Sequence, residues 1–262
     1  MDEAPQRTPC PPGCNAFLVL LTDTHSSFSN RSGGDDDRIV QGFSCQKNSR
    51  PYQASLQAGG MHFCGGALIA DQWVLTSAQC YQSNFQVVLG EHDITKYEGT
   101  EQVIDVYKAI KHPHFNTETL DNDIMLIKLA KRANLSPFVQ TGTLPSDCRG
   151  TTSTCIVSGW GNTSPTDAYY PASTLQCLDS PIVSYVTCYF YYPGRLTDNM
   201  LCAGYVGGFT PCKGDEGGPL VCKDVLEGLV SWGNRCDVKN SPHVYTMVCN
   251  YIQWIRDTMR YN

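Results

Sequence analysis

The chain has 262 residues, of which 41% are hydrophobic and 17% are charged, so it can bury a substantial core. This composition excludes an intrinsically disordered chain. The formal net charge is −6, and the Lys and Arg residues are scattered along the sequence rather than clustered. Because binding to phosphate groups needs clustered positive charge, we expect no nucleic-acid partner.

The first 38 residues differ in composition from the rest of the chain. Asn15 to Thr22 (NAFLVLLT) has the apolar character of a signal-peptide core, but it is short, and Asp2 and Glu3 stand where positive charge is expected. A cleaved signal peptide and an ordinary N-terminal segment therefore both stay open. No run reaches the roughly 18 apolar residues of a membrane span, so we expect no span.

Cysteine is unusually frequent, with 14 residues spread widely along the chain. Wide spacing favours long-range disulfides, which form in an oxidising compartment, and we therefore expect a secreted protein. A metal site is the alternative, but the sequence contains no CxxC pair, and Cys10 and Cys14 are the only close couple. Spacing alone does not assign the pairing.

From Ile39 onward, short β-branched and aromatic stretches such as Phe85 to Leu89 and Thr154 to Ser158 alternate with Gly, Pro, Asn and Asp clusters. This pattern predicts an all-β fold. Near the C-terminus, apolar residues recur at steps of three and four, which predicts a helix with one packed face. These residues are Val248, Tyr251, Ile252, Ile255 and Met259.

Six short segments give the strongest functional signal, because each one alone is weak but all occur in a fixed order and spacing. They are Ile39 to Gly42 (IVQG), Leu75 to Cys80 (LTSAQC), Asp121 to Leu126 (DNDIML), Ser158 to Gly161 (SGWG), Gly214 to Pro219 (GDEGGP) and Ser231 to Gly233 (SWG). Together they resemble the chymotrypsin/trypsin family of serine proteases, most closely the trypsins, from Ile39 almost to Asn262.

The resemblance implies an all-β domain at 39–262, with residues 1–38 as a separate N-terminal segment. Two antiparallel six-stranded β-barrels are expected at about 39–140 and 141–246, with the site between them and a C-terminal α-helix at about 247–260. It also implies a monomer and six disulfides, with Cys10 and Cys14 left over. The implied pairs are Cys45 with Cys177, Cys64 with Cys80, Cys148 with Cys249, Cys155 with Cys222, Cys188 with Cys202, and Cys212 with Cys236.

The same resemblance identifies the triad positions, of which only Asp123 keeps the family residue. Gln79 stands at the histidine position, and an amide has no useful basicity near neutral pH. Glu216 stands at the serine position, where a carboxylate attack on a peptide would require an anhydride and an unassisted amine leaving group. The oxyanion-hole N–H groups belong to Gly214 and Glu216, and the Glu216 carboxylate is expected either to fold onto these amides or to point across the cleft.

The specificity pocket implied by the resemblance is also altered. It contains Ser231, Trp232 and Gly233, but Thr210 replaces the aspartate of trypsins and His243 replaces a glycine. Arg235 replaces a small residue at the rim. We therefore expect no efficient cleavage after Lys or Arg. His62 matches a histidine common in trypsins, and we interpret it as a structural hydrogen-bonding residue rather than a substitute base.

Two further features of the family are retained in the sequence. Asp35 to Arg38 before Ile39 resembles a zymogen activation site, after whose cleavage the Ile39 amino group would pair with Asp215; a solvated acidic linker is the alternative. The acidic loop at 91–101 resembles the trypsin calcium site, and a solvated acidic loop is again the alternative. The implied Ca²⁺ ligands are the carboxylates of Glu91, Glu98 and Glu101 and the backbone carbonyls of Asp93 and Lys96.

These residues together predict a secreted, catalytically inactive homologue, a pseudoprotease, that binds or regulates an unidentified protein partner. The alternative is an active serine endopeptidase that uses a rearranged site. A protein can keep the fold of its family after it has lost the catalytic residues. The resemblance alone therefore does not decide between an inactive and an active protein.

Overall fold

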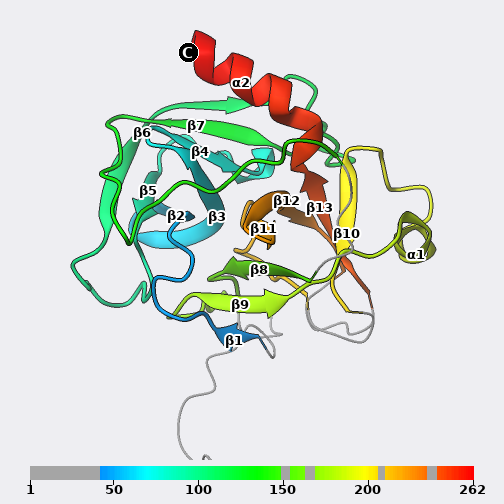
Figure 1. Cartoon of the computed structure of the whole chain (residues 1–262), viewed down its shortest axis with the longest axis horizontal. Helices are drawn as coiled ribbons and strands as arrows, with labels where there is room; N and C mark the ends of the chain where they lie inside the picture. The colour runs from blue at the N-terminus through cyan, green and yellow to red at the C-terminus, as the bar shows by residue number, and fades with distance from the viewer. Residues whose placement is uncertain (1–41, 149–153, 163–168, 206–209, 235–240) are drawn as a thin grey trace, which may run out of the picture. The chain divides into compact units, whose positions relative to one another are not determined.

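The computed structural model of the chain describes residues 42–148, 154–162, 169–205, 210–234 and 241–262 (Figure 1). These residues belong to the compact unit Asp36–Asn262. The strands, in chain order, are β1 (Phe43–Ser44), β2 (Gln53–Ala58), β3 (Met61–Ala70), β4 (Trp73–Thr76), β5 (Gln86–Leu89), β6 (Gln102–Lys111), β7 (Met125–Leu129), β8 (Cys155–Gly159), β9 (Gln176–Asp179), β10 (Met200–Ala203), β11 (Pro219–Cys222), β12 (Val225–Trp232) and β13 (His243–Met247).

The first half forms the predicted closed six-stranded antiparallel barrel, in the order β2-β3-β4-β7-β6-β5. Period-two burial explains why these segments become strands: in β6 the side chain of Ile104 is buried, whereas its neighbours Val103 and Asp105 are exposed. Leu56 of β2 lies opposite Val87 of β5, and both are fully buried in the barrel interior. Closure leaves no free strand edge in this half.

The second half confirms the all-β class but differs in detail from a closed six-stranded barrel. It is a seven-stranded antiparallel sheet in the order β1-β9-β8-β11-β12-β13-β10, with β1 added from the start of the domain. An isolated antiparallel bridge pairs Ile182, which follows β9, with Ala203 of β10, the last strand of the sheet. The chain after β9 therefore lies against the opposite edge of the sheet. Val157, Leu220 and Tyr245 form part of its core.

The predicted C-terminal helix is present, with a tighter first turn. A 3₁₀ helix, η2 (Val248–Tyr251), leads into α2 (Ile252–Tyr261). Tyr251 and Ile255 are buried in a core cluster that also contains Leu126 of β7 and Leu229 of β12, so the helix packs where the two halves meet. Neither α-helix in the described part of the chain has the length and apolarity that crossing a bilayer requires.

A short helix that the sequence pattern did not predict, α1 (Tyr185–Tyr191), precedes β10. Its residues are mostly aromatic or β-branched, which favours strands, but the hydroxyl of Ser184 accepts the N–H of Thr187 at 3.1 Å and caps the helix start. Local capping therefore outweighs the strand preference of the sequence.

Five of the six implied disulfides are confirmed, and their Cα–Cα distances of 4.2 to 6.1 Å lie within the range that a disulfide spans. They are Cys45–Cys177, Cys64–Cys80, Cys148–Cys249, Cys155–Cys222 and Cys188–Cys202. Cys212 is also disulfide-bonded. Its implied partner Cys236, like Cys10 and Cys14, lies outside the described residues.

Candidate functional site

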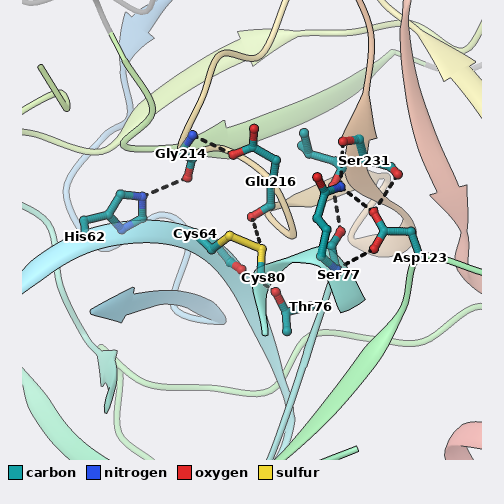
Figure 2. Close-up of a disulfide and its surroundings, with 12 residues drawn as sticks. His62, Cys64, Thr76, Ser77, Cys80, Asp123, Gly214, Glu216 and Ser231 are labelled. Carbon is teal, nitrogen blue, oxygen red and sulfur yellow. Dashed lines mark hydrogen bonds between the residues drawn. A yellow bond between two sulfur atoms is a disulfide. The ribbon is translucent and has the colours of Figure 1, made fainter. Parts of the chain in front are cut away.

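Asp123 lies two residues before β7 and is completely buried, at a point where segments from both halves meet. Its Oδ1 accepts the backbone N–H of Gln79 at 2.9 Å, and its Oδ2 accepts the Ser231 hydroxyl at 2.7 Å (Figure 2). The Gln79 side-chain amide donates to Oδ2 as well, at 2.5 Å. Burial raises the pKa of Asp123, and the donors from Ser231 and Gln79 offset part of that rise.

Gln79 lies on the short 3₁₀ helix η1 (Ala78–Cys80), next to the disulfide of Cys80. Its side-chain nitrogen also donates to the backbone carbonyl of Ser231 at 2.8 Å. The two hydrogens of the amide are therefore used, one on Asp123 and one on Ser231. The group holds the buried aspartate in place but cannot accept a proton from a nucleophile.

Glu216 lies in the tight turn before β11, which the surrounding structure holds in place. The backbone carbonyl of Glu216 accepts the N–H of Gly65 at 2.8 Å and lies 3.4 Å from the disulfide sulfur of Cys80. Gly217 has a φ of +75°, and a Cβ there would collide with the Thr76 side chain and the Gly65 carbonyl. The turn therefore positions the backbone regardless of the side chain at 216.

The Glu216 carboxyl group turns back onto its own turn. Its Oε2 accepts the backbone N–H of Gly214 at 2.6 Å, and in Figure 2 the group points toward Gly214 and away from Asp123. Burial raises the pKa of Glu216 to about 7; the N–H groups of Glu216 and Gly214 lower it, and the nearby carboxylates of Asp215 and Asp123 raise it. Of the two orientations expected from sequence, the structure has the one folded onto the amides.

His62, at the start of β3, is buried and hydrogen-bonded at both ring nitrogens. Nε2 lies 2.9 Å from the Gly214 carbonyl, and Nδ1 lies 2.8 Å from the Ser55 hydroxyl. A carbonyl only accepts, so we assign the proton to Nε2, and Nδ1 then accepts from Ser55. Burial lowers the pKa of His62 to about 4. A neutral ring with both nitrogens engaged fits a positioning role and not that of a base.

Asp215 is almost completely buried beside the same turn. Its carboxylate accepts the N–H groups of Gly161 at 2.7 Å and Cys212 at 2.9 Å. Burial raises its pKa to about 6, and these two hydrogen bonds lower it. Arg38 and Ile39 lie outside the described residues, so the activation switch stays a prediction.

The predicted pocket residues Thr210, Ser231, Trp232 and His243 are buried, with Ser231 and Trp232 at the end of β12 and His243 at the start of β13. A Cβ on Gly233 would overlap the His243 imidazole, so the ring fills the space beside that glycine. Burial lowers the pKa of His243 to about 3, which makes the ring neutral. Within the described residues, Thr210 Oγ1, Trp232 Nε1 and His243 Nδ1 have no hydrogen-bond partner. Arg235 lies outside these residues.

The predicted metal ligands Glu91, Glu98 and Glu101 converge, with one carboxylate oxygen of each within 4.8 Å of the others. Burial raises the pKa of Glu91 to about 7, and the charge of Glu101 adds to this rise. The Lys96 ammonium is bound to Asp93 at 2.6 Å, and Lys47 neutralises only Glu98, at 2.7 Å. Three close carboxylates with incomplete neutralisation fit a hard cation.

Two residues near the site gave no signal in the sequence. The Tyr169 hydroxyl donates to the His62 carbonyl at 2.9 Å, and the Tyr169 ring lies where a side chain at Gly214 would go. The Arg195 guanidinium lies 4.2 Å above the Trp232 ring. Both contacts join segments far apart in sequence, so no local pattern could have indicated them.

Comparison with known proteins gives consistent matches. The family model described as Trypsin matches residues 39–255. Trypsin-3 of Salmo salar is 55% identical over 229 residues, which cover 87% of this chain and 95% of that protein. Cationic trypsin-3 of Rattus norvegicus and trypsin of Xenopus laevis are each 54% identical, over 246 and 247 residues, which cover 94% of this chain and 99% of each relative. The chain therefore belongs to the trypsin family of serine proteases.

Proposed function

We propose that this trypsin-family chain has lost proteolytic chemistry and acts outside the cell as a binding protein for another protein. The observation that carries the proposal is the bonding of Gln79, whose amide is committed to Asp123 and Ser231. The disulfides support an extracellular location, because such bonds persist in oxidising compartments.

The chemical step fails at both substituted positions. In this family a serine hydroxyl attacks the carbonyl, a histidine takes its proton, and the buried aspartate orients the histidine. Gln79 offers no base, and the Glu216 carboxylate is directed at the Gly214 amide. Loss of triad members costs on the order of 10⁶ in kcat in a serine protease, and the losses are not additive.

Recognition of a basic substrate side chain fails separately. Thr210 supplies no carboxylate, and the neutral His243 ring occupies the space beside Gly233. A Lys or Arg side chain would be buried there without an ionic partner among the described residues, which costs several kcal/mol. Substrates of the trypsin type are therefore excluded by two independent changes.

We also propose that Glu91, Glu98 and Glu101, with the backbone carbonyls of Asp93 and Lys96, hold a structural Ca²⁺ ion. The convergence of the three carboxylates supports it. The ion would neutralise their mutual repulsion and tie the loop between β5 and β6 to the first barrel. Its contribution is to stability and not to chemistry.

The second candidate is an active serine-type endopeptidase. The relatives in the comparisons are named trypsins, and this finding supports the second candidate more directly than it supports a pseudoprotease. The two readings differ on one measurable point, which is turnover of a peptide bond by this sequence.

The test is to express the chain, cut it after Arg38 and assay it with an acylating fluorophosphonate probe and a broad peptide library. We expect neither labelling nor turnover above a heat-inactivated control. Labelling or turnover that is abolished by heating would establish the second candidate instead. Trypsin that is prepared and assayed in the same way is the positive control for both readouts.

A further inference from the structure

The helix α1 presents aromatic side chains to solvent rather than to the core. Tyr185 and Tyr189 are 58% and 45% exposed, and Val186 and Phe190 are each 79% exposed. These four residues, which we call the α1 face, form two i, i+4 pairs on the side of the helix opposite the buried Cys188. A surface helix usually directs its polar residues outward, and adjacent large apolar side chains left in water mark an interaction site.

The α1 face is held in a fixed position at the edge of the second half. A disulfide joins Cys188 to Cys202 of β10, the last strand of the sheet (Figure 1). The hydroxyl of Ser184 caps the start of the helix, and the Tyr192 hydroxyl, just past its end, donates to the Pro242 carbonyl at 2.6 Å. Rigid aromatic side chains lose little conformational entropy on binding, so this face is preorganised for a partner.

One cation stands beside the α1 face. Arg195 is the only charged residue between Asp179 and Asp198, and its backbone N–H donates to the Tyr192 carbonyl at 3.2 Å in the turn that follows the helix. The Arg195 side chain is exposed and has no ion-pair partner among the described residues. Its guanidinium lies 4.2 Å above the Trp232 ring, and this stacking orients the group while its edge can still bind a carboxylate.

The composition of this surface distinguishes between the possible occupants. Tyr, Phe and Arg are enriched at protein–protein interfaces. A helix that lies on a membrane combines apolar residues with several Lys or Arg residues, whereas α1 contains no charged residue. A symmetric pair of chains would bring two copies of Arg195 together without a carboxylate from residues 180–197. The surface therefore fits a different protein that supplies the missing negative charge.

We propose that the α1 face and Arg195 form a docking surface for a protein segment that carries an apolar side chain next to an Asp or Glu. The apolar side chain packs against the Tyr and Phe rings, and the carboxylate binds the Arg195 guanidinium. The inference rests on the proposed function, because it gives the chemistry of the partner that a binding protein requires. The surface includes neither Gln79 nor Glu216, so it does not depend on the state of the substituted triad.

The experiment is a selection from a displayed library of random peptides of about 12 residues, with the full chain as the target. Chain carrying Tyr189→Ser and Phe190→Ser is present as a soluble competitor, so peptides that bind elsewhere are removed. The most enriched peptide is synthesised with a fluorescein label, and its Kd is measured by fluorescence polarisation in about 0.1 M and about 1 M NaCl. The variants are Phe190→Ser and Arg195→Gln. Tyr107→Ser, which removes a 71% exposed ring from β6, is the matched control.

We expect the enriched peptides to combine Asp or Glu with Leu, Ile, Phe or Trp. Arg195→Gln should weaken binding about tenfold in about 0.1 M NaCl and less in about 1 M NaCl, because salt screens the ion pair. Phe190→Ser should weaken it about tenfold in both, and Tyr107→Ser should have no effect. The selection does not impose the dependence on Arg195, which is therefore an independent test of the carboxylate.

A selection that enriches no peptide, enriched peptides without an acidic residue, or equal binding by Arg195→Gln would each overturn the proposal. So would one of the other occupants. A dimer in sedimentation that Phe190→Ser abolishes would assign the surface to a second copy, and binding to phosphatidylcholine vesicles would assign it to a membrane. Peptide binding that appears only after cleavage at Arg38 would assign it to residues 1–38. Peptide hydrolysis is measured separately with the fluorophosphonate probe and the peptide library, so the inference and the proposed function can fail separately.

Discussion

Gln79 and Glu216, at the two positions that the family resemblance assigns to the catalytic histidine and serine, differ in what they do for the structure. Gln79 completes a network, because its amide satisfies a buried carboxylate and a backbone carbonyl. Glu216 places a negative charge beside Asp215 and Asp123, and within the described part of the chain only backbone N–H groups compensate it. The residue at one position is therefore expected to stabilise the structure, and the residue at the other is expected to strain it.

The largest effect is expected when the residues at both positions are changed to those of the family. We predict that Gln79→His with Glu216→Ser does not restore trypsin activity on a short arginyl amide after cleavage at Arg38. Adding Thr210→Asp and His243→Gly should raise the rate by a factor of at least about 10², because an unpaired buried charge costs several kcal/mol. The rates are measured side by side with trypsin.

A double revertant that alone approached the trypsin rate would contradict the pocket interpretation. The chain would then have lost its chemistry without losing its specificity. The variant with only Thr210→Asp and His243→Gly is the matched control, and it should stay inactive.

The stabilising half of the comparison is tested by Gln79→Ala, which removes the side-chain donors to Asp123 and Ser231. We expect the free energy of unfolding in urea to fall by about 2–3 kcal/mol, because a buried charged acceptor loses a donor. Gln86→Ala is the matched control, since Gln86 donates to Asp105 at an exposed site and should cost only a few tenths of a kcal/mol. Equal losses in the two variants would remove the special role of Gln79.

The strained half is tested by Glu216→Gln across pH. The folded pKa of about 7 lies above the unfolded value near 4.5, so the stability from the neutral group is complete below pH 4.5 and is lost as pH rises through 7. We therefore expect Glu216→Gln to be more stable than the unmodified chain by about 3 kcal/mol at pH 8 and nearly equal to it at pH 4.5. Urea unfolding at both pH values measures it, and a gain that is independent of pH would refute the titration argument.

The smallest expected effect concerns the acidic loop, which lies away from both positions. At 1 mM Ca²⁺ we expect the free energy of unfolding to rise by about 1 kcal/mol over a chelated sample. Glu101→Gln should abolish this rise, and Glu118→Gln, at an exposed position outside the cluster, should keep it. A rise that survives Glu101→Gln would place the ion elsewhere.

Periodicity predicted the all-β class, and the resemblance to the trypsin family implied the five described disulfides and the convergence of Glu91, Glu98 and Glu101, because relatives share a backbone. The helix α1 was missed because its aromatic and β-branched residues favour strands, although Ser184 before it is a local signal for a helix start. The orientation of Glu216 stayed open in the sequence because its alternatives differ only by side-chain torsions. The contact of His243 with Gly233 is a tertiary contact between the start of β13 and the residue after β12, which no periodicity encodes.

The Cys64–Cys80 disulfide has a consequence for local motion. It joins β3, which contains His62, to the short helix η1, which contains Gln79. The sulfur of Cys80 also contacts the Glu216 carbonyl. Native proteins open locally in contiguous cooperative units, and we expect these linked segments to form one such unit. Native-state hydrogen exchange at Gly65, Cys80 and Gly217 should therefore report a single cooperative opening, and the loss of this disulfide would divide the site into independently fluctuating parts.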